Sequence, residues 1–294
     1  MNGAAAVARY TLLDLSRRRV LLVFFVIGAA GIALLGVGLK LVYQVLSANP
    51  AGFGANNQGD PATFNSFLEL LFVTYLVQAL AIFGLLLAYG IGMTAIYHDL
   101  DSGTAVSIFS KPVSRFAFST GKIAAAVVGL LAIVGLLAIE ARIAMLLFGG
   151  GLESALTAQI VATVANAVVI MLIVLALSAW MNNILAAVLT FIYYNVITGV
   201  IAFLHSLADS GVLGNDIVKG VFAILYWLVP HPLVSSAVRE LAKRQLELSG
   251  AQAGNAAALA SIPNASGTAD ILWWGFNVVF LGAVVYLAVR RRQV

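Results

Sequence analysis

The 294-residue chain contains no cysteine and few charged residues. Without thiols it forms neither disulfides nor thiolate metal sites, and cysteine usage gives no information about the redox compartment. Charged residues make up 10% of the sequence, hydrophobic residues make up 62%, and the mean hydropathy is +1.03. Soluble domains average about 25% charged and about 45–50% apolar residues. The composition therefore excludes an ordinary soluble domain and predicts an integral membrane protein.

Motifs for catalysis are equally scarce. The phosphate-binding pattern GxxxxGK[ST] is absent, because Gly121 and Lys122 are followed by Ile123 and lack the upstream glycine. The histidines lie far apart in the sequence, which favours interfacial side chains over a metal site: His98, His205 and His231. Basic residues are scattered along membrane flanks without an aromatic platform, so nucleic acid is not an expected partner. We predict no catalytic, cofactor-binding or metal site, and no enzymatic activity of the chain alone.

Six long apolar segments are present instead, each near the roughly 20 residues that a membrane-spanning helix needs. They are Val20 to Leu41, Leu70 to Tyr97, Ile123 to Phe148, Leu156 to Trp180, Ile184 to Leu204 and Ile271 to Val289. The fourth and fifth are separated at Asn182 and Asn183, since one helix without a break would far exceed the ~30 Å hydrocarbon core. Continuous apolar runs also differ from the alternating strands of a barrel. The sequence predicts an all-α fold with six transmembrane helices.

Basic residues indicate the orientation. The first apolar run is preceded by Arg17, Arg18 and Arg19 and is too long for the apolar part of a signal peptide. We therefore predict that it is a retained first span. Cytoplasmic N- and C-termini, with the 98–122 segment on the same side, place about ten of the 16 basic residues inside. We therefore expect a multi-pass protein of the cell inner membrane, with residues 1–19 forming a cytoplasmic interfacial helix.

Residues 206–270 then form the longer extracytoplasmic loop, with short helices. Ile217 to Val229 is apolar but too short to span, and Pro230 and Pro232 stop it. Val234 to Leu248 has the pattern of an amphipathic helix, whose charged side lies either in the membrane interface or on an ordinary solvated face.

Residues 98–122 form a polar, basic segment between two uncharged runs, which we call the island. Asp101 and Ser102 can cap a short helix that begins near Gly103, and Pro112 ends it. Ser114 can cap the next helix, which continues into the third span. The pattern predicts a surface helix, a sharp turn and re-entry into the bilayer, with Lys111 and Arg115 exposed at the bend. An element of this shape can transmit force from a cytoplasmic partner.

The island resembles the E-x-G-T-(x)n-L-S-[RK]-P-V-S-R-x-x-F-x-x-G-K block of type-2 ATP-binding-cassette (ABC) transporter permeases, among them the bacterial group that includes the nitrous oxide reductase maturation permease. The matching residues are Asp99, Asp101, Gly103, Thr104, Ser110, Lys111, Pro112, Val113, Ser114, Arg115, Phe118, Gly121 and Lys122. One departure is that Asp99 and Asp101 stand where relatives usually have Glu. The six predicted spans and the long last outer loop extend the resemblance over most of the chain.

The resemblance implies a single permease domain over residues 1–294, which dimerises with an identical or different subunit and binds a separate cytoplasmic ABC ATPase. ATP and Mg would be bound by that ATPase. The residues implied in ATPase coupling are Asp99, Asp101, Gly103, Thr104, Lys111, Pro112, Ser114, Arg115, Phe118 and Lys122. The helix before the first span, at Tyr10 to Arg19, would lie along the membrane. The expected function is ATP-driven transport, with export favoured.

Two other functions remain open. An ATP-independent channel or secondary carrier would use polar residues in the middle of the bilayer, such as Asn166, Asn195 or Gln78, although interhelical hydrogen bonds also explain them. A non-transporting membrane scaffold is the other alternative. Glu140 and Arg142 lie in the third span, but Glu140 is ~27 Å along the helix from Lys122, near the outer boundary. We predict an interfacial charge pair there.

Overall fold

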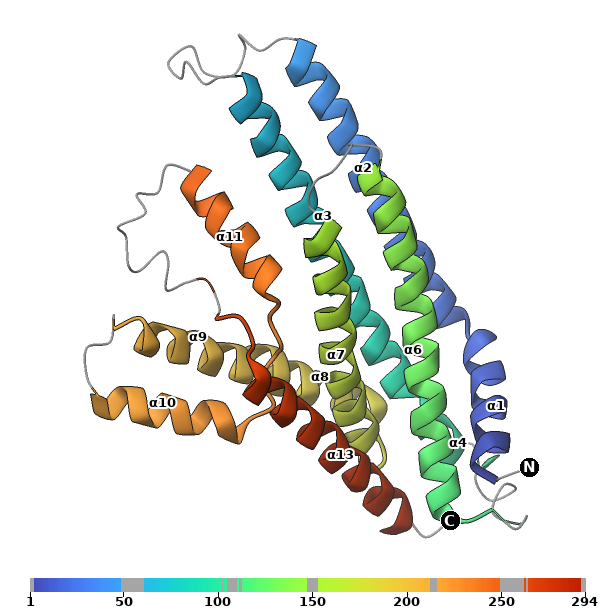
Figure 1. Ribbon diagram of the computed structural model, residues 1–294. Coiled ribbons are helices and arrows are strands. Elements are labelled where there is room, and N and C mark those ends of the chain that lie inside the picture. Colours follow the sequence, from blue (N-terminus) through green and yellow to red (C-terminus); the bar gives the residue numbers. More distant parts are fainter. Residues whose placement is uncertain are drawn as a thin grey trace.

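A computed structural model describes residues 3–48, 61–101, 103–104, 110, 113–146, 153–211, 216–248, 262 and 264–291. Every regular element among these residues is a helix (Figure 1). The elements are α1 (Gly3–Ser16), α2 (Arg19–Ala48), α3 (Pro61–Ala95), α4 (Tyr97–Asp101), α6 (Arg115–Leu146), α7 (Glu153–Ser178), α8 (Asn183–Thr190), the π-helix η2 (Phe191–Ile197), α9 (Thr198–Asp209), α10 (Asp216–Leu228), α11 (Ser236–Leu248) and α13 (Thr268–Arg291).

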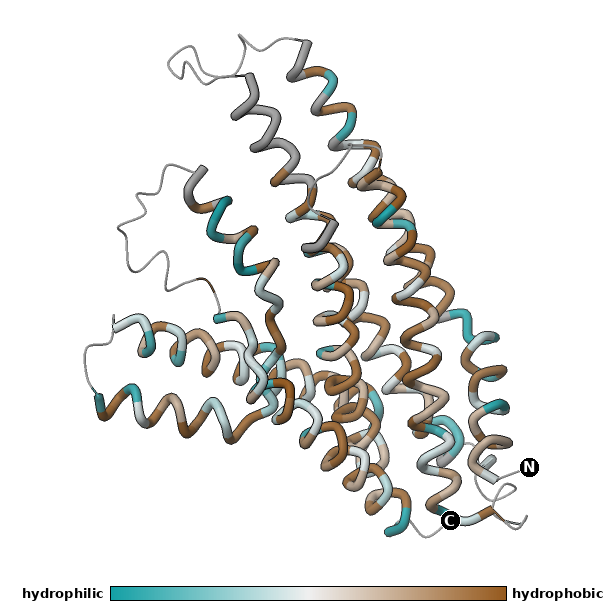
Figure 2. Tube along the Cα trace, in the orientation of Figure 1, coloured by the Kyte–Doolittle hydropathy of each residue, from teal (hydrophilic) through white to brown (hydrophobic). Residues whose placement is uncertain are grey.

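Six helical stretches of the described chain are long and apolar enough to cross a membrane. They are Leu21–Val42, Val73–Asp99, Arg115–Leu146, Leu156–Ser178, Asn183–Asp209 and Thr268–Arg291. The prediction of a multi-pass, all-α membrane protein is confirmed, and Figure 2 shows the hydrophobic residues along these helices. The predicted break between the fourth and fifth spans is also confirmed, since Asn182 caps α8 by accepting a 2.9 Å hydrogen bond from the Ile184 backbone N–H.

The core of the bundle is formed where α3 packs against α7. Gly92 permits this contact, because a Cβ atom there would lie 2.8 Å from Cβ of Val174. About 67% of the α7 span is buried, against 22% for α2 and 17% for α13. The helices at the periphery therefore expose apolar faces, as expected where lipid or a second subunit is the neighbour.

The polar residues of the middle spans join helices to one another. Asn166 in α7 binds the backbone of Leu233 twice, by donating to its carbonyl (2.9 Å) and accepting from its N–H (2.8 Å). Asn195 in η2 donates to the Tyr89 hydroxyl at 2.7 Å. These contacts satisfy the two amides structurally. Gln78 is exposed on α3.

Among the described residues of the 206–270 segment, α10 and α11 are short helices, at the positions where the sequence predicts an apolar and an amphipathic helix. α10 ends at Leu228, just before Pro230 and Pro232. α11 packs its apolar side on α7 and α3, and Leu241 is buried there. On its charged side, Glu240 and Arg244 are exposed and pair at 3.8 Å, while Arg239 and Lys243 are half-buried. Packing on the bundle therefore orders the apolar face of this amphipathic helix.

Candidate functional site

α1, α4 and the start of α6 meet at a buried ion pair. Asp99 of α4 pairs with Lys122 of α6, and both side chains are inaccessible, at 1% and 0% exposure. A lone buried charge is costly, whereas opposite charges in contact compensate one another. The pair therefore fixes the beginning of the island to its end. We call Tyr10, Asp99, Phe118 and Lys122 the α1–α4–α6 junction.

Aromatic rings complete the surroundings of Lys122. Its Nζ lies 5.6 Å from the ring centroid of Tyr10 and 5.7 Å from that of Phe118. Both distances are within the range of cation–π attraction. Partial burial, followed by the nearby carboxylates of Asp99 and Asp14, raises the pKa of Tyr10, so this phenol is neutral at physiological pH. The ammonium thus contacts one carboxylate and two neutral rings.

α1 lies directly alongside the first half of α6. Gly121 allows the closest approach, since a Cβ there would lie 2.6 Å from the carbonyl oxygen of Ala4 and 2.9 Å from Cβ of Val7. Further along, Leu15 packs near Gly129, so α1 follows the direction of α6. The predicted helix before the first span is present. Its position along the membrane surface stays a prediction.

The end of α13 reaches the same region. Arg115 donates to the carbonyl oxygens of Arg290 (2.7 Å) and Val289 (3.5 Å). These are acceptors at a helix C-terminus, where a cation is favourable. α1 begins and α13 ends at this end of the bundle (Figure 1). Ser114 accepts a 3.1 Å hydrogen bond from the Ala117 N–H, which confirms it as a cap of α6.

The ten residues implied in ATPase coupling are thus divided between the interior and the surface. Asp99, Phe118 and Lys122 are buried, and Arg115 is half-buried against α13. Asp101, Gly103 and Ser114 are exposed and Thr104 is half-buried, while Lys111 and Pro112 lie outside the described residues. The predicted helix from Gly103 is also largely outside them. Asp101 is the last residue of α4, and Gly103 follows with a left-handed φ of +73° that suits glycine.

The structure describes both residues of the predicted Glu140–Arg142 pair. Residues two apart in a helix point to different sides. Glu140 is half-buried and Arg142 is exposed near the far end of α6. The interfacial charge pair stays a prediction.

A second polar cluster, which sequence reasoning missed, lies where α9, α10 and the start of α13 meet. His231 is stacked on Tyr226, with ring centroids 3.7 Å apart. The ring of His205 also contacts Tyr226, in an edge-on arrangement with centroids 4.4 Å apart. Asp270 accepts 3.0 Å hydrogen bonds from the Tyr226 hydroxyl and from His231 Nε2. One signal was available, since His205 and Asp209 stand four residues apart on one helix and lie 3.3 Å apart. Among the described residues, no group of three or more His, Cys, Asp or Glu is arranged to hold a metal ion.

No protein-family model and no curated protein matches the chain.

Proposed function

We propose that this chain is the membrane-spanning permease subunit of an ATP-driven ABC transporter, with export as the favoured direction. The observation that carries the proposal is the buried Asp99–Lys122 ion pair, which ties both ends of the island to α1 and α6. A loop anchored in this way passes a push from a cytoplasmic partner directly to spanning helices. The chain supplies the pathway, and a separate ATPase supplies ATP hydrolysis.

The division between buried and exposed residues supports this mechanism. The buried Asp99, Phe118 and Lys122 would hold the loop on the bundle, while the exposed Gly103 and Ser114 stand at the surface available to an ATPase. The hydrogen bond from Arg115 to the Arg290 carbonyl also links the end of α13 to the start of α6. Movement of the loop would then displace α1, α6 and α13 together. A second permease subunit, identical or different, would cover part of the apolar surface of the peripheral helices.

Co-expression with the cassette ATPase encoded nearest to this chain tests the proposal. We expect the two proteins to copurify, and reconstitution with this chain to change the ATPase rate. Deletion of Gly103 to Lys111 should abolish copurification while the protein still inserts into the membrane.

The matched control is a deletion of equal length, Gln252 to Ala260, between α11 and α13. It should leave copurification intact. Failure of the intact chain to bind the ATPase, or equal binding by the chain lacking Gly103 to Lys111, would contradict the permease assignment. Ion flux through the chain alone without ATP would favour the channel alternative.

A further inference from the structure

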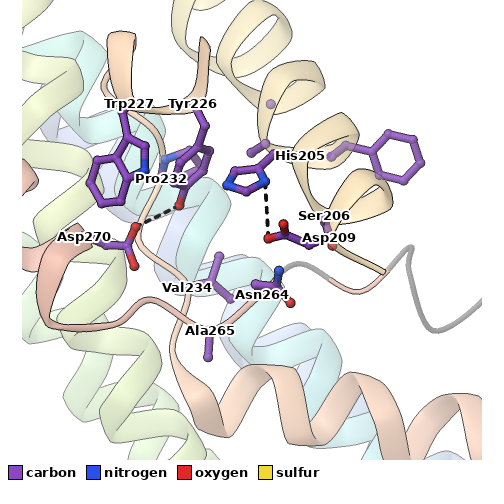
Figure 3. A pocket seen from close by; sticks show the side chains of 13 residues that line it. His205, Ser206, Asp209, Tyr226, Trp227, Pro232, Val234, Asn264, Ala265 and Asp270 are labelled. Atoms are coloured by element: carbon purple, nitrogen blue, oxygen red, sulfur yellow. Dashed lines mark hydrogen bonds and ion pairs between the residues drawn. The ribbon is translucent and has the colours of Figure 1, made fainter. Parts of the chain in front are cut away.

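A pocket of about 330 Å³ opens where α9, α10 and the start of α13 meet. Figure 3 shows Tyr226 between Asp270 and His205, with Asp209 on the far side of His205. The side chains that matter for recognition are Phe203, His205, Asp209, Tyr226, Trp227 and Asp270. Its volume is at the lower end of the ~300–1,000 Å³ typical of small-molecule sites. The pocket thus has the size for a small organic molecule.

The pocket lies at the edge of the spanning region. Asp209 ends one candidate span, and Asp270 stands in the first turn of another. Arg290, at the other end of the same helix, contacts Arg115. The pocket is therefore at the opposite end of α13 from the α1–α4–α6 junction.

The carboxylate of Asp270 accepts three hydrogen bonds at the border of this pocket. Its Oδ1 accepts hydrogen bonds from Tyr226 and His231, and its Oδ2 accepts one of 2.6 Å from the Gly267 N–H. Tyrosine and the backbone amide are neutral donors. The other ring nitrogen of His231, Nδ1, lies 3.1 Å from the Tyr226 carbonyl oxygen. Burial lowers the pKa of His231, against the opposing influence of its hydrogen bonds and of Asp270. These contacts hold the carboxylate in place at the edge of the cavity, and none of them comes from a lysine or arginine.

Asp209 adds a second, weaker negative charge. Lys219 Nζ is 3.9 Å from Asp209 Oδ1, and the Asp209 side chain is 36% exposed, so solvent and the lysine partly compensate it. None of the described residues that line the pocket is a lysine or arginine. Two carboxylates in a partly enclosed pocket create a local negative potential.

Aromatic rings provide the remaining contact surface. Phe203, Tyr226 and Trp227 line the pocket from α9 and α10. Ring faces attract cations, and the attraction strengthens where water is excluded. A cation would gain more from the two carboxylates than a neutral hydrogen-bond donor would, and an anion would be repelled by them.

We propose that this pocket binds a small organic cation, an alkyl- or arylammonium compound whose charged nitrogen lies by Asp270 and whose apolar part contacts Phe203 and Trp227. This site is independent of the proposed transport function. It is present in the chain alone, so its test needs no ATPase, and either proposal can fail without the other.

The test is a calorimetric titration of the full-length chain in nanodiscs of zwitterionic lipid with benzyltrimethylammonium. Benzyl alcohol, which keeps the ring without the charge, is titrated in parallel. We expect saturable binding of the cation, at least about tenfold tighter than that of the alcohol, because the carboxylates favour only the charged ligand. Absence of saturable binding by the cation, or equal binding of the two compounds, would overturn the proposal.

Substitutions locate the site. Asp270→Asn should weaken binding of the cation by about tenfold, and Asp209→Asn by about threefold, because the second carboxylate is more exposed. Asp216→Asn, which removes a carboxylate of α10 outside the pocket, should leave binding unchanged. Equal affinity of the Asp270→Asn and wild-type chains would exclude this pocket as the binding site.

A pair of glycine substitutions tests the site without altering its charges or hydrogen bonds. Gly199 lines the pocket, and a Cβ added there meets nothing within 4 Å, so Gly199→Leu should fill the cavity and abolish binding without disturbing the fold. Gly220 is also helical and equally unobstructed but lies outside the pocket, so Gly220→Leu is the matched control and should bind normally. Binding by the Gly199→Leu chain at wild-type affinity would overturn the assignment.

Discussion

The two ends of the bundle stabilise a carboxylate in different ways. At the junction, Asp99 meets the ammonium of Lys122, and neither side chain is accessible. In the pocket, Asp270 is bound by the hydroxyl of Tyr226, the ring of His231 and a backbone N–H, and it borders a cavity. The first carboxylate contacts a buried ammonium, whereas the second contacts hydrogen-bond donors and the edge of a cavity. The comparison separates a charge that holds helices together from one that can bind a ligand.

Loss of the ammonium at the junction should have the largest effect on stability. Lys122→Met leaves Asp99 buried without its counter-charge, and removing one partner of a buried pair costs about 3–5 kcal/mol. The free energy of unfolding can be measured by SDS titration of the purified chain. In the pocket, Asp270→Asn should cost only about 1 kcal/mol, since it weakens hydrogen bonds without stranding a charge.

The double variant Asp99→Asn/Lys122→Met sharpens this contrast. It removes both charges and should recover most of the stability that Lys122→Met loses. If the double variant were as unstable as the single one, packing rather than charge compensation would hold the junction.

Close packing at the junction should give an intermediate effect. Gly121→Leu pushes a side chain against the backbone of α1, and overpacking of this kind costs about 1–3 kcal/mol. Gly135→Leu is the control, because it lies on the same helix and its Cβ meets nothing within 4 Å. Melting temperatures of the two variants give the comparison. If Gly121→Leu and Gly135→Leu melted at the same temperature, α1 would be readily displaced from α6.

The pocket end should show the smallest effect, a dependence of stability on pH. Because the pKa of folded His231 lies below its ordinary value of 6.5, the unfolded chain binds the proton more readily. This contribution to stability is therefore present above about pH 6.5 and is lost as the pH falls through the folded pKa.

The melting temperature of the wild-type chain should fall as the pH is lowered from 7.5 to 5, and that of His231→Asn should fall less. Parallel pH profiles of the wild-type and His231→Asn chains would contradict a role for this imidazole.

The spans were predictable because they depend on local composition. Each apolar run is long enough to identify a helix by itself, and Asn182 identified the break between two of them. The capping role of Ser114 was predictable for the same reason, as it involves only neighbouring residues.

The partners of the charged residues were not predictable, because they depend on how distant segments fold together. The island sequence does not show that Lys122 turns inward to Asp99, and its basic character suggested a surface role instead. His205, Tyr226, His231 and Asp270 come from separate elements and share no sequence periodicity. Only the proximity of His205 to Asp209 on one helix was readable beforehand.

One uninterrupted helix connects the two ends. α13 carries Asp270 in its first turn and presents the Arg290 carbonyl to Arg115 in its last, a separation of ~30 Å at 1.5 Å per residue. An axial translation or rotation of this rod is shared by both termini, so the geometry around Asp270 and the Arg115 contact change together. Spin labels on the first and last turns of α13, each measured against α7, would record that shared displacement as correlated distance changes.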